Sequence, residues 1–172
     1  MPPSADVRFD ALMQSALELS AEHEVDQVLD RVVRCAATVA GAEYAALGVY
    51  DSSGRIERFV HHGLEAEAVA LIGPLPEGRG LLGEGIVTDG PIRVADIGAD
   101  PRSCGFPHHH PPMRSFLGVP VRVAGRRYGN LYLTEKVGGG DFTVADEEIV
   151  VALAAAAGVA IENARLYDEA TR

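Results

Sequence analysis

Residues 116–134 read FLGVPVRVAGRRYGNLYLT, and this stretch decides the fold class. Two β-like runs, Phe116–Val123 and Tyr128–Thr134, are separated by the turn-forming residues 124–127. Apolar runs that flank a short glycine-containing link are typical of a β-hairpin. The sequence therefore predicts two adjacent antiparallel strands in the second half of the chain.

Side-chain alternation assigns the second strand of this hairpin two different faces. Successive side chains of a strand point to opposite sides, so Leu131 and Leu133 share one face and Tyr132 takes the other. We expect the two leucines to pack on helices, which turns Tyr132 toward the loops. In the first strand, Pro120 has no N–H to donate, so a bulge or an edge position is expected there.

Helical periodicity brackets the strands at both ends of the chain. Apolar residues at steps of three and four predict a helix over Val25–Ala40 that ends at Gly41, and another over Phe9–Leu19. Near the C-terminus, Thr143 is placed to cap a long helix that runs nearly to the end. This helix carries small residues around Gly158, which would let another helix approach closely.

Shorter β-like runs lie between these helices and the hairpin. Tyr44–Tyr50 and Ile56–His61 are joined by turn residues 51–54, and a further short strand is expected over Ile92–Ile97. The resulting order predicts an α+β fold with a central antiparallel β-sheet, in which terminal helices cover one face. Ligand-side loops and short helices are expected on the other face.

Composition limits the domain count, the partners and the cellular compartment. The chain has 172 residues, with 15 Lys and Arg against 25 Asp and Glu, a net charge of −10. This length predicts one domain over residues 1–172, and the acidic balance argues against nucleic acid or an anionic membrane as partner. Cys35 and Cys104 are far apart and form no CxxC pattern, which favours a reducing cytoplasm.

Candidate chemistry concentrates in histidines rather than in a catalytic motif. No Gly-x-Ser-x-Gly, His-Glu-x-x-His or Walker pattern occurs, so binding is favoured over catalysis. Pro111 disfavours α conformation at His110, which places this imidazole on a stiff, extended corner. Apolar residues surround the corner: Phe106, Met113, Phe116 and Leu117.

Three interpretations of the histidine cluster are open at this point. His110 could be the proximal ligand of a haem iron. Alternatively, Cys104 with His108 or His110, joined by His61 or His62, could bind Zn²⁺. The third interpretation is a solvated polar loop.

The complete pattern resembles a GAF domain over residues ~7–168, essentially the whole chain. Four motifs are similar to the haem-binding first GAF domain of DevS/DosT-type sensor histidine kinases: Gly105-Phe106-Pro107, His110-Pro111-Pro112-Met113, FLGVPV over 116–121 and GNLYLT over 129–134. This resemblance implies a non-enzymatic sensory domain of a two-component signalling protein. It also implies haem b as cofactor and a diatomic gas (oxygen, nitric oxide or carbon monoxide) or redox state as signal.

The resemblance also implies roles for individual residues. His110 corresponds to the proximal iron ligand, and Tyr132 to a distal tyrosine that hydrogen-bonds the gas. The pocket is expected to include Phe106, Met113, Phe116 and Leu117, while His108 and His109 could compete for the iron. The domain is expected to lead into a longer protein and to form a homodimer through its terminal helices, including the Gly158 face.

Two further alternatives belong to other functional classes. The first is a non-haem GAF dimerisation and signal-transmission module with an empty pocket or another small molecule. The second is an enzyme similar to the GAF-fold methionine sulfoxide reductases, which needs several placed cysteines. Only Cys104 lies in the loop region, so this alternative ranks last.

Overall fold

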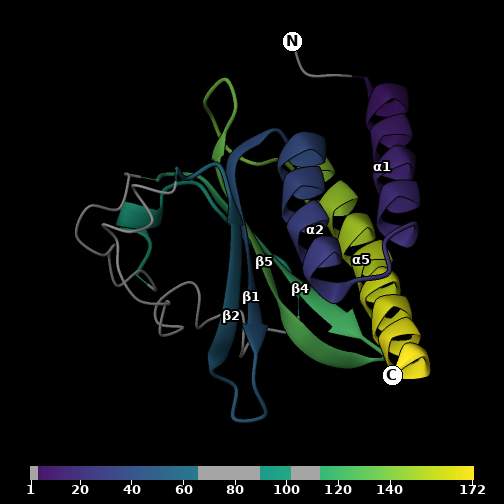
Figure 1. Cartoon of the computed structure of the whole chain (residues 1–172). Coiled ribbons are helices and arrows are strands. Elements are labelled where there is room, and N and C mark those ends of the chain that lie inside the picture. The colour runs from purple at the N-terminus through teal and green to yellow at the C-terminus, as the bar shows by residue number, and fades with distance from the viewer. Residues whose placement is uncertain (1–3, 66–89, 102–112) are drawn as a thin grey trace.

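The computed structural model describes residues 4–65, 90–101 and 113–172 (Figure 1). Within these residues, the helices lie together on one side of an antiparallel sheet. The elements are α1 (Ala5–Ser20), α2 (Val25–Ala40), β1 (Ala42–Tyr50), β2 (Ile56–His62), β3 (Ile92–Val94), the 3₁₀ turn η1 (Ile97–Ala99), β4 (Phe116–Val123), β5 (Arg126–Lys136) and α5 (Val144–Thr171). The α+β prediction is confirmed.

The sheet has the strand order β2-β1-β5-β4-β3, with every neighbouring pair antiparallel. The predicted hairpin is β4 and β5, in which Phe116 pairs with Thr134. Because β5 also pairs with β1, the strand that carries Tyr132 lies at the centre of the sheet. Both edges of β5 are therefore paired with other strands, and only its two faces can contact helices or a ligand.

The third predicted strand is shorter than expected. It ends at Val94, and the chain turns into η1 because the side chain of Asp96 accepts a hydrogen bond from the N–H of Gly98. The prediction that Pro120 lies at an edge position or a bulge is confirmed. The pairing of β3 with β4 extends only as far as Gly118, so Pro120 has no strand neighbour on that side within the described residues. The ladder between β4 and β5 is irregular just beyond this proline, between Val121 and Arg122.

Local capping explains where the helices begin and end. Gly41 follows α2 in the left-handed conformation, with φ of +68°, which glycine adopts without steric cost. At the start of α5, the hydroxyl of Thr143 accepts from the N–H of Asp146, and the Asp146 carboxylate accepts from the N–H of Thr143. This reciprocal capping box satisfies two donors that the helix itself leaves unpaired.

The helix-side face of the sheet holds the main hydrophobic core. Leu131 and Leu133 are fully buried there, in one cluster with residues of α2 and α5, as alternation predicts. The prediction that Gly158 lets another helix approach is wrong. A Cβ at this glycine would lie 2.0 Å from the carbonyl oxygen of Arg122 on β4, so the small residue lets α5 approach its own sheet. The Gly158 face is consequently not available to a second subunit.

None of the described helices combines the length and the apolar character that crossing a membrane requires.

Candidate functional site

The face of the sheet opposite the helices carries a second, smaller hydrophobic cluster. Tyr132 lies in it, as alternation along β5 predicts, and its ring centroid is 6.0 Å from that of Phe116. The other buried members are Ile92, Val94, Ile97 and Met113. This cluster covers the face of the sheet on which the ligand-side loops are expected.

A small cavity lies beside the residues of this cluster. Its volume is about 10 Å³, which is room for about one water molecule. The described residues that line it are Gly90, Ile92, Phe116, Gly118, Pro120, Asn130 and Tyr132. The lining is therefore mostly apolar, with polar atoms at one end, which is the usual composition of a small-molecule site.

The polar end consists of two phenols and one amide. Asn130 Nδ2 donates to the hydroxyl of Tyr50 at 2.6 Å and lies 3.4 Å from the hydroxyl of Tyr132. The two hydroxyl groups are 3.3 Å apart. Asn130 is only 2% exposed, and its Oδ1 has no hydrogen-bond partner among the described residues.

Both phenols keep their protons at neutral pH. Burial raises the pKa of Tyr132 far above its ordinary value, and the adjacent Tyr50 phenol raises it further. Burial also raises the pKa of Tyr50, although its contact with Tyr132 opposes the shift. The cluster therefore offers neutral hydrogen-bonding groups rather than a charge.

The predicted site residues divide between the two faces. Phe116 and Tyr132 line the cavity, and Met113 lies in the same cluster, where its sulfur accepts from the hydroxyl of Thr134 at 3.1 Å. The assignment of Leu117 to the pocket is wrong. It is fully buried on the helix side, because it is adjacent to Phe116 in a strand and must face the other way.

The predicted iron and metal ligands lie mostly outside the described residues. This holds for His110, Cys104, His108 and His109, and the predicted pocket residue Phe106 also lies outside the described residues. His61 and His62 end β2, and the Nδ1 atom of His61 is buried with no partner among the described residues. In the part of the chain that the structure describes, no three His, Cys, Asp or Glu side chains gather to hold a metal ion.

Sequence reasoning did not identify Tyr50 and Asn130 as site residues. Asn130 is two positions from Tyr132 on one strand, so alternation alone places both on the same face. Tyr50 requires the strand register, in which Gly48 of β1 pairs with Asn130 of β5. That register depends on residues far apart in the chain and could not be read from a local pattern.

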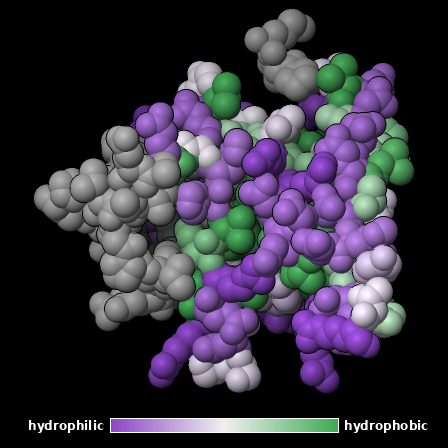
Figure 2. Space-filling model, viewed as in Figure 1, coloured by the Kyte–Doolittle hydropathy of each residue, from purple (hydrophilic) through white to green (hydrophobic). Residues whose placement is uncertain are grey.

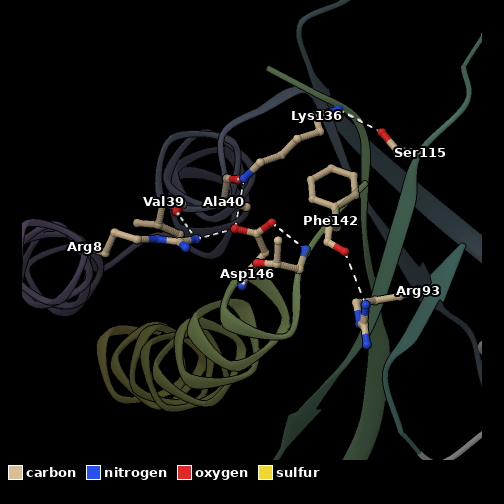
Figure 3. Close-up of polar contacts among 9 residues, drawn as sticks. Arg8, Val39, Ala40, Arg93, Ser115, Lys136, Phe142 and Asp146 are labelled. Atoms are coloured by element: carbon tan, nitrogen blue, oxygen red, sulfur yellow. Dashed lines mark hydrogen bonds and ion pairs between the residues drawn. The ribbon is translucent and has the colours of Figure 1, made fainter. Parts of the chain in front are cut away.

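A second polar cluster lies at the far end of β5 (Figure 3). Asp146 is fully buried, and its Oδ1 accepts from Arg8 Nη2 at 2.6 Å and from Lys136 Nζ at 2.9 Å. The same two cations donate to the carbonyl oxygens that end α2, Arg8 to Val39 and Lys136 to Ala40. We call Arg8, Lys136 and Asp146 the ion cluster.

The ion cluster joins the strand of the candidate site to the helical layer. Arg8 comes from α1, Lys136 from β5 and Asp146 from α5. Burial would raise the pKa of Asp146, but the Thr143 N–H and the two cations together hold this pKa below its usual range. The carboxylate thus stays ionised and ties three elements together.

Known proteins share this architecture. A family model described as GAF domain matches residues 22–162. The fold is similar to the GAF domain from a phosphoenolpyruvate-protein phosphotransferase of Coxiella burnetii, with 25% identity, a TM-score of 0.81, and coverage of 97% of this chain and 99% of that one.

Two further solved structures have the same fold in different functional settings. Free methionine-R-sulfoxide reductase from Neisseria meningitidis is 20% identical, with a TM-score of 0.77 and coverage of 96% of this chain and 95% of that one. A GAF domain assigned to a sensor histidine kinase of Pseudomonas syringae pv. tomato is 18% identical, with a TM-score of 0.64 and coverage of 96% and 92%. At these identities the likeness establishes the fold alone.

Proposed function

The chain belongs to the GAF domain family, and on that premise we propose that it is the sensory, ligand-binding domain of a two-component signalling protein. GAF domains are sensory and signalling modules. The observation that carries the proposal is the cavity over Tyr132, whose apolar lining ends in neutral hydrogen-bonding groups. The domain is proposed to bind and transmit, with no turnover of its own.

The proposed ligand is haem b, with His110 as the proximal iron ligand. On the described face, Phe116 and Met113 supply apolar contact and Tyr132 supplies a neutral phenol, which suits a porphyrin and a distal hydrogen bond. Haem iron supplies a coordination position for a diatomic gas. A porphyrin needs far more room than the present cavity of about 10 Å³, so its binding requires the pocket to enlarge.

Transmission would follow β5. This strand carries Tyr132 at the cavity and Lys136 in the ion cluster, so a displacement of the strand reaches α1 and α5 through Asp146. A ligand can shift such an equilibrium only by binding one arrangement more tightly than the other. The ion cluster is the contact through which that difference would reach the terminal helices.

Absorption spectroscopy with hemin tests the haem proposal. Titration of the unmutated protein is expected to give a saturable, sharp Soret band. The band should disappear in His110→Ala and persist in the matched control His108→Ala. Absence of a saturable band in the unmutated protein would reject haem as the ligand.

A non-haem dimerisation and signal-transmission module is the second candidate, and two observations favour it. The cavity is small, and large apolar side chains are exposed on α1 and α5, including Phe9, Leu17, Val159 and Leu166. Figure 2 shows hydrophobic groups at the surface along the helical layer among mostly hydrophilic ones. We propose that the homodimer uses these outward side chains.

Sedimentation velocity tests this homodimer. Phe9→Glu and Val159→Glu place a charge on the exposed faces of α1 and α5 and are expected to give monomers. Val137→Glu is the matched control, because Val137 is equally exposed but lies between β5 and α5. A monomeric unmutated protein, or dimers in all variants, would contradict this interface.

A further inference from the structure

The amide of Asn130 is the least satisfied polar group at the candidate site. Its nitrogen faces Tyr50 at 2.6 Å and Tyr132 at 3.4 Å, while Oδ1 has no hydrogen-bond partner among the described residues. The side chain is 2% exposed on the central strand of the sheet. A buried acceptor that is left unpaired costs free energy, so a partner for Oδ1 is expected in the functional state.

The residues next to Asn130 offer its amide oxygen no hydrogen-bond donor. Its cross-strand neighbours are Gly48 on β1 and Pro120 on β4, and neither has a polar side chain that could reach the amide. Gly118, beside Tyr132, is packed closely by the ring of Phe116, since a Cβ there would lie 3.0 Å from that ring. Asn130, Gly118 and Pro120 all line the cavity.

We propose that Asn130 contacts the ligand directly, with its amide oxygen accepting a hydrogen bond from an O–H or N–H group of a small, neutral molecule. The apolar body of this molecule would lie over Gly118 and against Phe116, which requires the cavity of about 10 Å³ to enlarge. The inference rests on the ligand pocket of the proposed function, but it does not require haem. A diatomic gas has no hydrogen to donate, so the gas alone would leave Oδ1 unpaired.

A purely structural role for Asn130 explains the geometry less well. The surrounding cluster is apolar, and a leucine of similar size would pack there without an unpaired acceptor. Replacing buried polar groups by apolar groups of the same shape is often neutral for stability. The partner of Oδ1 is therefore either the one water that the cavity has room for or the donor group of a ligand that displaces this water.

Matched probes test the proposal on the ¹⁵N-labelled full chain. Phenol carries an O–H donor, and fluorobenzene has nearly the same shape without one. Dissociation constants are obtained from the backbone amide shifts of Gly48 and Gly118 during titration. One neutral hydrogen bond predicts that phenol binds about five- to tenfold more tightly than fluorobenzene.

Three variants locate this preference. In Asn130→Leu the ratio of the two dissociation constants is expected to fall to about one. Asn130→Asp keeps an acceptor oxygen at the position and is expected to keep the preference for phenol. Thr134→Val removes a hydroxyl from the same strand and face, outside the cavity lining, and should leave the ratio unchanged.

The side-chain amide resonances of Asn130 give a measurement that needs no variant. They are expected to shift with phenol and not with fluorobenzene in the unmutated protein. Equal affinities for the two probes, or a preference that persists in Asn130→Leu, would overturn the inference and leave the hemin titration unaffected. The absence of any shift with either probe would also overturn it, whereas the haem proposal is decided separately by the Soret band.

Discussion

Replacing Asp146 by asparagine removes the only carboxylate of the ion cluster while keeping its shape. An asparagine oxygen can still accept from the N–H of Thr143, so the helix cap survives and the change isolates the charge. Arg8 and Lys136 would then lose the anion that both contact, although their side chains are only 15% and 22% exposed. Two poorly hydrated cations would remain close together.

The size of the effect follows from this burial. Removing one partner of a buried ion pair costs about 3–5 kcal/mol, because the remaining charge stays uncompensated. For a domain of this length, each kcal/mol lowers the melting temperature by about 2–4 °C. Asp146→Asn is therefore expected to lower it by roughly 6–20 °C.

Thermal and urea unfolding, followed by circular dichroism, measure this loss. Glu148→Gln is the matched control, since it removes a carboxylate from an exposed position in the first turns of the same helix. The control should change the free energy of unfolding by about 0.5 kcal/mol or less. If Asp146→Asn were no more harmful than Glu148→Gln, the ion cluster would not hold the terminal helices to β5.

Acid should weaken the same contact, because the pKa of Asp146 is lower in the folded protein than its ordinary value of 3.8. The stabilisation by the ionised carboxylate is present above this ordinary pKa and is lost as the pH falls through the lower pKa of the folded state. Urea unfolding should then show the difference between the unmutated protein and Asp146→Asn shrinking below about pH 4, and a constant difference would contradict this. Gly158→Ala adds a methyl group 2.0 Å from the carbonyl oxygen of Arg122 and should cost about 1–3 kcal/mol of unfolding free energy, while an unchanged melting temperature would show that α5 does not pack so closely on β4. Tyr132→Phe should alter the discrimination among oxygen, nitric oxide and carbon monoxide while leaving hemin affinity nearly unchanged, because the phenol acts on the bound gas. Equal gas responses in the two proteins would remove Tyr132 from the mechanism.

Local patterns predicted the helices, the hairpin and the faces of β5. Leu131, Tyr132 and Leu133 alternate as written, because the period of a strand is fixed by its backbone. The same rule contradicts Leu117 as a pocket residue. It was grouped with Phe116 by nearness in the chain, although neighbours in a strand face opposite sides.

Contacts between distant residues could not be predicted in this way. Arg8 and Asp146 are separated by 138 positions, and only the packing of α1 beside α5 brings them together. Tyr50 reaches Asn130 through the register of β1 on β5. The small residues around Gly158 suit a helix or a sheet equally well, so composition alone did not reveal the partner.

Paramagnetic broadening by ferric hemin tests the central claim, that the ligand lies on the loop-side face of the sheet. In ¹H–¹⁵N spectra of the full chain, the amide signals of Ile92, Gly118 and Tyr132 are expected to broaden at stoichiometric hemin. Signals of Leu29 and Val150, buried in the helical layer, should stay sharp. Broadening that is absent, or equally strong in the helical layer, would contradict a haem site over Tyr132.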